Sequence, residues 1–229
     1  MNADDSAAVV YRQNWRDALD RHNVKRLVHF THIENLSGIL RRGLVSRATL
    51  ESWARLGRPF RSNDDVRHDG WRFVCLSISF PNARLFWRFR ETSRSEDWCV
   101  LGLKRGIVAI PGCEFCITNA TSKGERARPP ESRRGIAAFD RMFEDIQVVG
   151  ASKSSGCVVR ACDLPAEWTT CQQAEILCPF VISSDCIESV FVRDERVAAL
   201  AEGVLGRFGS RDLLVLDPAM FSPRRDDQM

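Results

Sequence analysis

The chain has 229 residues, of which 44% are hydrophobic and 28% charged, so its apolar content is sufficient for a packed core and excludes global disorder. Its 33 lysines and arginines stand against 30 acidic residues, and the formal net charge of +3 excludes a histone-like basic protein. The length predicts one domain, and no apolar run approaches the roughly 20 residues of a membrane helix, so no membrane association is predicted.

The N-terminal part is predicted to hold two helices around one strand. Residues 8–22 have a helical pattern, and residues 26–30 (RLVHF) are typical of a strand. A second helix is predicted over residues 31–43, because Thr31 and Glu34 form a T-x-x-E capping pair and apolar residues then recur at helical spacing. This helix would begin directly after the strand.

The middle of the chain is predicted to be rich in short strands. An arginine-rich polar segment, residues 45–70, comes first, with a short helix near 49–57 and then a loop. The predicted strands, separated by glycine and proline, are residues 72–80, 98–104, 106–110 and 114–118. Residues 119–134 are predicted to be a polar loop.

The last third alternates helices and strands. The predicted helices are residues 135–146, which are amphipathic, and 193–208; the predicted strands are 175–182, 187–192 and 212–217, with a frayed tail at 222–229. Taken together, these elements predict a mixed α+β fold with many short strands and few helices.

The nine cysteines are an odd number and lie in apolar, strand-like runs, which is typical of reduced, buried thiols in a cytosolic protein. The acidic first residues lack the basic and then apolar pattern of a secretion signal, so a cytoplasmic location is predicted. A zinc site built on Cys113-x-x-Cys116 would need a second ligand pair at a suitable spacing, and the sequence has none. No metal site is predicted.

Positive charge is concentrated in three segments. Residues 41–72 hold eight arginines and four acids, and residues 84–94 and 123–134 each have a local excess of +3. In the second segment, aromatic residues interleave with arginines, a mixture typical of a groove for single-stranded nucleic acid. The alternative is a half-buried edge element whose arginines are merely solvated.

Several well-known catalytic motifs are absent from the sequence. It contains no G-x-G-x-x-G or Walker loop and no G-x-S-x-G, which excludes dinucleotide-binding, P-loop and hydrolase readings of those types. One acid is conspicuous: Glu175, in CQQAEILCPF, begins an otherwise apolar strand. Such a carboxylate either sits at an exposed strand end or is held in a cleft.

Two separate segments resemble one family. HFTHIENLSGILRRGLVSR (residues 29–47) resembles the opening of the DarT nucleic-acid ADP-ribosyltransferases, T-H-x-[DE]-N-[LI]-x-x-[IL]-L-x-x-G-L, and QQAEIL (172–177) is similar to their Q-A-E segment, whose glutamate is catalytic. RFVCLSISFPNARLF (72–86) resembles their central strand and turn, and CITNATSKG (116–124) a T-[DN]-x-x-A loop. The resemblance covers most of residues 25–192.

The resemblance implies an ADP-ribosyltransferase fold: a split, strongly bent β-core with an NAD+ cleft and flanking helices, in one domain over residues 1–229 with its core at about 25–192. It implies a toxin that transfers ADP-ribose from NAD+, its co-substrate, to a nucleobase in single-stranded DNA, in a toxin–antitoxin or phage-defence role. Because such an enzyme would harm its own cell, a macrodomain antitoxin that removes the mark is the implied partner.

The same resemblance implies roles for individual residues. Glu175 would stabilise the oxocarbenium-like transition state and hold the ribose hydroxyls. Arg67 is the best match to a catalytic, NAD-contacting arginine, with Arg72 and Arg61 as alternatives. The remaining NAD-contacting residues would be Thr31, His32 and Asn35, at the tip of the second helix, and Ser77. The DNA groove would be lined by Arg84, Phe86, Trp87, Arg133 and Arg134.

Other functions stay open at this stage. An RNA-modifying enzyme could use the same groove, and Gln173 with Glu175 fits the Q-x-E pattern of transferases that modify protein side chains. A catalytically inactive nucleic-acid-binding module on the same fold is a third alternative. The identity of the acceptor base is also open, because SISFPNARLF departs from the Y-F-x-P-x-S-P-M of thymidine-modifying members and Gln172 replaces an arginine or tyrosine.

Overall fold

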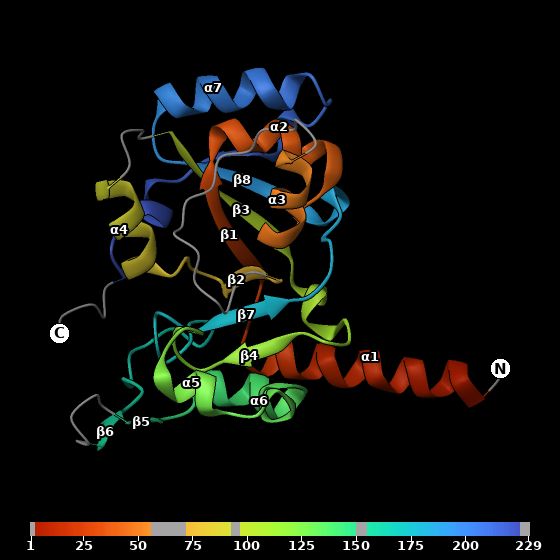
Figure 1. Cartoon of the computed structure of the whole chain (residues 1–229), viewed down its shortest axis with the longest axis vertical. Coiled ribbons are helices and arrows are strands. Elements are labelled where there is room, and N and C mark those ends of the chain that lie inside the picture. Colours follow the sequence, from red (N-terminus) through yellow and green to blue (C-terminus); the bar gives the residue numbers. More distant parts are fainter. Residues whose placement is uncertain (1–2, 56–71, 93–96, 150–154, 225–229) are drawn as a thin grey trace.

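The computed structural model describes residues 3–55, 72–92, 97–149 and 155–224, and its centre is a sheet of seven strands in the order β4-β7-β2-β1-β3-β8-β9 (Figure 1). The strands are β1 (Arg26–His32), β2 (Val74–Ile78), β3 (Trp98–Lys104), β4 (Glu114–Cys116), β7 (Glu175–Cys178), β8 (Ile187–Val192) and β9 (Leu214–Leu216). A separate hairpin pairs β5 (Ile146–Val149) with β6 (Ser155–Val158).

Seven α-helices lie within the described residues, together with short 3-10 turns. The helices are α1 (Ala3–Arg21), α2 (Ile33–Arg42), α3 (Arg47–Ala54), α4 (Ala83–Thr92), α5 (Lys123–Ala127), α6 (Ile136–Asp140) and α7 (Glu195–Gly206). The 3-10 turns include η1 (Arg105–Ala109), η2 (Pro130–Arg133) and η6 (Pro218–Phe221). None of these helices is long and apolar enough to cross a membrane.

The sheet is split where β1 meets β2. These strands share only two registered pairs, Leu27 with Ile78 and Val28 with Ser77, whereas β1 pairs with β3 along its whole length. One half of the sheet therefore contains β1, β3 and β8, and the other contains β2, β7 and β4, as Figure 1 shows; β9 pairs with β8 at the edge of the first half. The split, bent core that the resemblance implies is confirmed.

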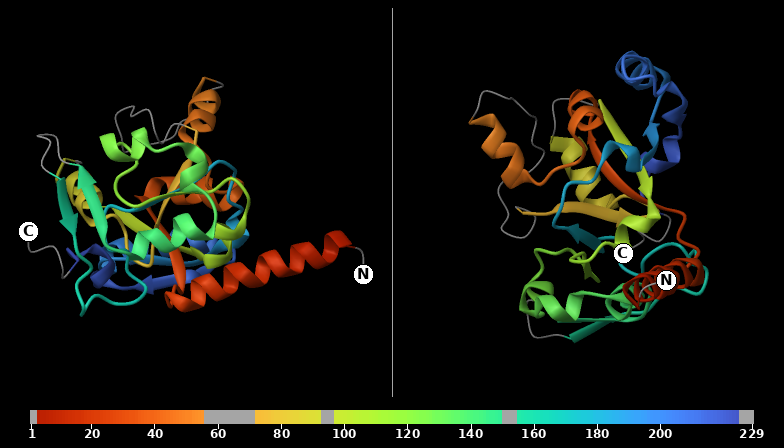
Figure 2. Two further views of the ribbon diagram at one scale, coloured as in Figure 1. Left: turned by 90° about the horizontal axis from the view of Figure 1, so that it is seen from below. Right: turned by 90° about the vertical axis from the view of Figure 1, so that its right-hand side faces the viewer.

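The main hydrophobic core covers one face of both halves. Alternation along β1 sends Leu27 to this face, and the helices α1, α2, α6 and α7 contribute buried residues such as Leu36 and Val197. In the half of the sheet that contains β2, β7 and β4, the ring centre of Phe115 on β4 lies 5.6 Å from that of Trp15 in α1 and 5.7 Å from that of Phe139 in α6. Figure 2 shows that the N-terminal end of α1 projects beyond the rest of the molecule.

The opposite face, which we call the site face, carries the remaining side chains of the same strands. Because directly paired residues point to the same side, Val28 on β1 places Ser77 of β2 on this face. In the half that contains β1, β3 and β8, the helix α4 and the turn η6 cover the site face. They pack on it through an aromatic cluster in which the ring centres of Phe30 and Phe86 lie 4.6 Å apart. This cluster packs α4 against the site face.

The predicted helix at 31–43 forms, but its start was predicted wrongly. The helix α2 begins at Ile33, whose N–H donates to the carbonyl of Asp97 at 2.8 Å, and its N-cap residue is His32, with no side-chain cap. The T-x-x-E pair therefore does not cap the helix. Pairing of β1 with β3 extends to His32, so Thr31 stays in the extended strand conformation.

Other predictions about local structure also need correction. Residues 106–110 form most of η1 rather than a strand, because Ile107 and Val108 are both buried where the chain turns beside α1. The segment 119–134 is not a loop but contains α5 and η2, and residues 135–146 form only the short α6 and a further turn. Arg224, predicted to be frayed, is buried and donates to the Thr169 carbonyl at 3.0 Å.

The N-cap of α7 provides a first test of the local energetics. Asp194 accepts a hydrogen bond from the Val197 N–H at 3.0 Å, and this bond lowers the pKa of Asp194. The charged cap therefore stabilises the fold at neutral pH, and its contribution is lost as the pH falls below the unfolded value of about 4. We expect Asp194→Ala to lower the free energy of unfolding by about 1 kcal/mol at pH 7, as measured by urea denaturation.

The control for this prediction is Asp194→Asn, because asparagine caps helices as well as aspartate does. The difference between wild type and the alanine variant should narrow between about pH 5 and about pH 2, while the asparagine variant should stay close to wild type at neutral pH. A difference that does not change with pH would contradict the assigned role of the carboxylate.

Candidate active site

Glu175 lies at the first position of β7 and is buried, with 6% of its surface exposed. Its Oε1 accepts a hydrogen bond from the Asn82 side-chain amide at 3.3 Å, and its Oε2 accepts one from the Ala120 N–H at 2.9 Å. The sequence left two possibilities for Glu175, an exposed position at a strand end or a carboxylate held in a cleft. Its burial excludes the exposed position. Both oxygens are oriented from different elements, which fixes the carboxylate on the site face.

Asn82 connects three elements around this carboxylate. Its N–H donates to Ser77 Oγ on β2 at 3.2 Å, its Oδ1 accepts from the Leu85 N–H in the first turn of α4 at 3.2 Å, and its amide reaches Glu175 on β7. Sequence reasoning did not identify this residue. The available signal was an asparagine placed after a proline and before an amphipathic helix, which is a typical N-cap pattern.

The strand–helix junction at the start of α2 holds the first predicted NAD-contacting group. The Asn35 amide donates to Thr31 Oγ1 at 3.0 Å, so the structure brings these two predicted residues together. Thr31 and His32 are both buried, and the imidazole of His32 stacks on Trp98 with the ring centres 3.7 Å apart.

The register of the sheet relates this junction to the acid. Residues two apart on a strand share a face, so His32 lies on the same face as Val28, and Val28 pairs with Ser77. On the other half, Cys75 pairs with Leu177, which lies two residues from Glu175. His32, Ser77 and Glu175 therefore share the site face, although they come from three strands.

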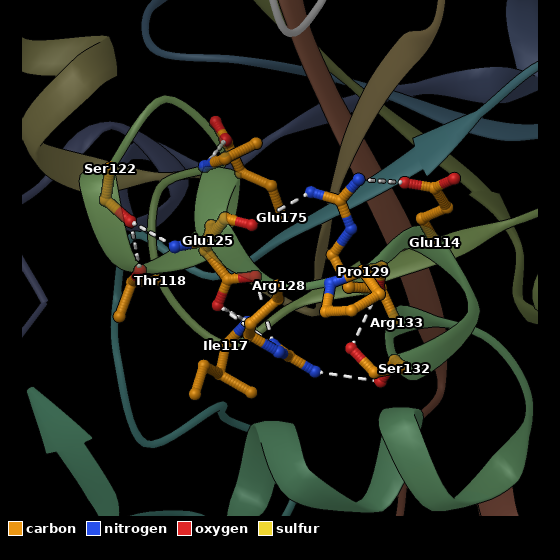
Figure 3. A network of polar contacts seen from close by, with 11 residues as sticks. Glu114, Ile117, Thr118, Ser122, Glu125, Arg128, Pro129, Ser132, Arg133 and Glu175 are labelled. Atoms are coloured by element: carbon orange, nitrogen blue, oxygen red, sulfur yellow. Dashed lines mark hydrogen bonds and ion pairs between the residues drawn. The ribbon is translucent and has the colours of Figure 1, made fainter.

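A segment that we call the strap, residues 117–134, covers the site face beside Glu175 (Figure 3). Its anchor is the buried Glu125, which accepts from the Ile117 N–H at 3.0 Å and pairs with Arg128 at 3.0 Å. The strap also contains Ala120, whose N–H holds Glu175. The order of the strap and the orientation of the acid are thus coupled.

Two predicted DNA-binding arginines have a structural role in the strap. Arg133 pairs with the buried Glu114 of β4 at 2.8 Å and donates to the Glu125 carbonyl at 3.2 Å, which leaves 14% of its side chain exposed. Arg134 donates to the other oxygen of Glu114 at 2.8 Å and is about half exposed. Arg133 therefore neutralises a buried acid, and its predicted contact with a nucleic acid stays a prediction.

The predicted contacts on α4 divide by helix face. Phe86 is 3% exposed and packs inside the aromatic cluster, so the prediction that it stacks on a base is wrong. The adjacent Trp87 is 59% exposed, and Arg84 in the first turn of the helix is also exposed. These two residues remain predicted DNA contacts, on the helix that Asn82 caps.

The predicted NAD-contacting arginine is not placed by the structure. Arg67 and its alternative Arg61 lie outside the described residues. Arg72 is described and is exposed just before β2. The choice among the three arginines therefore stays a prediction.

Two thiols lie close to Glu175, and burial raises the pKa of both. Cys116 pairs directly with Glu175 across β4 and β7, and Cys171 precedes β7. A raised pKa disfavours the thiolate, which is the nucleophilic form of a cysteine. Cys113 belongs to the main core while Cys116 lies on the site face, and within the described ranges no group of acids, histidines and cysteines is arranged to hold a metal.

His29 on β1 lies at the point where β1 and β2 diverge. Its Nδ1–H donates to the Cys75 carbonyl at 2.9 Å, which links β1 and β2 beyond their two registered pairs. Burial lowers the pKa of His29, and the hydrogen bond to Cys75 opposes this shift. Folding therefore shifts the imidazole towards its neutral form relative to the unfolded chain.

This shift predicts a pH dependence. Between the unfolded value of about 6.5 and the lower folded value, the unfolded chain binds more protons, so stability falls as the pH falls through this window. We expect wild type to lose about 1 kcal/mol more unfolding free energy between pH 7.5 and pH 5.5 than His29→Asn, as measured by urea denaturation. Asparagine can retain a donor near the Nδ1 position but does not titrate. Equal losses in the two proteins would contradict the assignment.

Comparisons with known proteins identify the family of the chain and its fold. The family model described as "ssDNA thymidine ADP-ribosyltransferase, DarT" matches residues 28–222, so α1 precedes the matched region. A search of curated proteins found no match.

Three solved structures show the same fold. Thermus sp. 2.9 DarT in complex with NAD+ is 18% identical with a TM-score of 0.54, over 86% of this chain and 97% of that one. Thermus sp. 2.9 DarT in complex with ADP-ribosylated ssDNA is 17% identical with a TM-score of 0.54, over 87% and 97%. Thermosipho africanus DarTG in complex with ADP-ribose is 19% identical with a TM-score of 0.54, over 86% of this chain. The present chain spans only about half (51%) of the length of that DarTG chain.

Proposed function

Because the chain belongs to the DarT family of single-stranded DNA thymidine ADP-ribosyltransferases, we propose that it transfers ADP-ribose from NAD+ to a base in single-stranded DNA. The observation that carries this proposal is the placement of Glu175, a buried carboxylate with both oxygens oriented by N–H donors on the site face. The solved Thermus DarT complexes with NAD+ and with ADP-ribosylated ssDNA support the choice of both substrates.

The chemistry requires an anion at the reacting ribose. Cleavage of the bond between nicotinamide and ribose develops positive charge on the sugar, and a fixed carboxylate stabilises that charge. The donors on Glu175 favour its ionised form, because hydrogen bonds to a carboxylate lower its affinity for a proton. A carboxylate can accept several hydrogen bonds at once, so the Glu175 carboxylate has the chemistry to accept one from a ribose hydroxyl as well.

The start of α2 is the proposed site for the dinucleotide phosphates. The N-terminal end of a helix carries partial positive charge, and His32 and Asn35 lie at this end. Thr31 keeps the Asn35 amide in place, and Ser77 lies on the strand between this junction and Glu175. Arg67 remains the proposed cation for NAD+.

The acceptor strand is proposed to lie along α4. Trp87 offers an exposed ring for base stacking, and Arg84 offers a cation for the backbone. In this arrangement Asn82, which caps the proposed DNA-binding helix, also donates to Glu175. We further propose a toxin role in the cytoplasm and a macrodomain partner that removes the modification.

The test offers one labelled NAD+ to three acceptors: a DNA oligonucleotide, an RNA of the same sequence, and total protein. We expect label only on the DNA, and mass spectrometry of the digested nucleosides should show a base heavier by one ADP-ribose. Label on RNA would indicate recognition that tolerates the 2′-hydroxyl. Label only on protein would favour the Q-x-E alternative, and no label on any acceptor would refute the proposal.

A further inference from the structure

We infer that Asn82 is a positioning residue that orients Glu175 and favours its ionised form, and this inference rests on the proposed function. Asn82 is 1% exposed, and all three of its hydrogen-bonding groups described above are engaged. The contact to Glu175 joins residues 93 positions apart in the chain. A residue needed only to cap α4 would not require this third contact.

The geometry of the carboxamide explains why asparagine suits this position. Its Oδ1 accepts from the Leu85 N–H, and this acceptor role fixes the orientation of the amide. The Nδ2 group is then left to point at Glu175 Oε1. Capping of the helix and donation to the acid are thus performed by opposite ends of one planar group, so they can be separated by substitution.

Asn82 also couples the acid to the proposed DNA-binding helix. The residue immediately precedes α4, which carries Arg84 and Trp87, and its N–H is tied to Ser77 on β2. A displacement of the first turn of α4 would therefore move the donor that holds Glu175. This link provides a physical route by which acceptor binding can be sensed at the catalytic carboxylate.

The ionisation of Glu175 depends on more than Asn82. Cys116 on β4 and Cys171 before β7 interact with it electrostatically. Further charged groups interact with these two thiols: Glu114, Glu125, Arg133, Arg84 and Arg224. All of them are unchanged when only position 82 is altered, so a change in the pKa of Glu175 between such variants reports on Asn82.

Two substitutions separate the roles. Serine and aspartate both cap helices about as well as asparagine, so Asn82→Ser and Asn82→Asp should fold. Serine removes the donor to Glu175, and aspartate replaces it with a second negative charge near the acid. Both changes disfavour the ionised carboxylate, and the aspartate variant should do so more strongly.

The experiment titrates the Glu175 carboxyl by carbon-13 NMR in the full chain, with assignment by Glu175→Gln, and measures kcat and KM in parallel. We expect the pKa of Glu175 to rise in Asn82→Ser and to rise by about one unit or more in Asn82→Asp. For Asn82→Ser, kcat should fall about 10- to 100-fold while KM for NAD+ stays within about 3-fold. The acid limb of the kcat–pH profile should move upward in both variants.

Thr92→Ala is the matched control, because Thr92 is exposed at the opposite end of α4 and bonds only within that helix among its described contacts. It should leave the pKa of Glu175 and kcat unchanged. An unchanged pKa and kcat in both folded position-82 variants would overturn the inference; if one variant unfolds, the other decides. If the wild type does not transfer ADP-ribose but the pKa of Glu175 rises in the position-82 variants, the proposed function is refuted while the Asn82–Glu175 contact is supported.

Discussion

Replacement of Glu175 by glutamine is expected to lower kcat for ADP-ribose transfer about 1,000-fold. The amide keeps the size of the side chain but carries no charge, so the developing positive charge on the ribose loses its nearest fixed anion. Transfer of labelled ADP-ribose to a DNA oligonucleotide measures the effect, with saturating NAD+ so that kcat is reported.

The glutamine variant should remain folded. Its amide nitrogen must face either the Asn82 amide or the Ala120 N–H, so one donor loses its acceptor, at a cost of about 1 to 2 kcal/mol. Glu188→Gln is the matched control, because Glu188 is exposed on β8. A folded Glu175→Gln that transfers ADP-ribose as fast as the Glu188 variant does would contradict the catalytic role of Glu175.

Replacement of Glu114 by alanine is expected to lower the free energy of unfolding by about 3 to 5 kcal/mol. The substitution leaves Arg133, whose side chain is 14% exposed, without its carboxylate partner in a buried position. It also removes the acceptor of Arg134. Urea denaturation followed by circular dichroism measures the change.

The matched control is Glu131→Ala, which removes an exposed acid from the same strap. It should change stability by no more than about 0.5 kcal/mol. Adding Arg133→Met to the Glu114 variant should recover part of the loss, because no unpaired charge then remains. If the Glu114 and Glu131 variants are equally stable, Glu114 and Arg133 do not form the buried ion pair described.

Glu175 shows what the sequence could and could not predict. Its position at the head of an apolar strand indicated either an acid at an exposed strand end or an acid held in a cleft. The resemblance of QAE to the family's catalytic segment favoured the second. The donors that orient it come from Asn82 and Ala120, which are 93 and 55 positions away. Contacts at such separations depend on the pairing of β2, β4 and β7 and leave no local pattern in the sequence.

The aromatic residues of α4 show a second limit. Alternation of arginine with Phe86 and Trp87 suggested a stacking surface, but a helix turns adjacent residues by about 100°, so neighbours face different ways. Phe86 consequently joins the core, whereas Trp87 faces solvent. The start of α2 was misplaced for a related reason, because pairing between β1 and β3 overrides a local capping pattern at Thr31.

The most direct test of the account is a crystal structure of this protein with carba-NAD+, the compound bound in a solved Thermus sp. 2.9 DarT structure. We predict that the ribose bearing the nicotinamide lies within hydrogen-bonding distance of the Glu175 carboxylate and that the pyrophosphate lies at the start of α2 beside His32. A dinucleotide bound on the face covered by α1 and α7, or away from Glu175, would contradict the account.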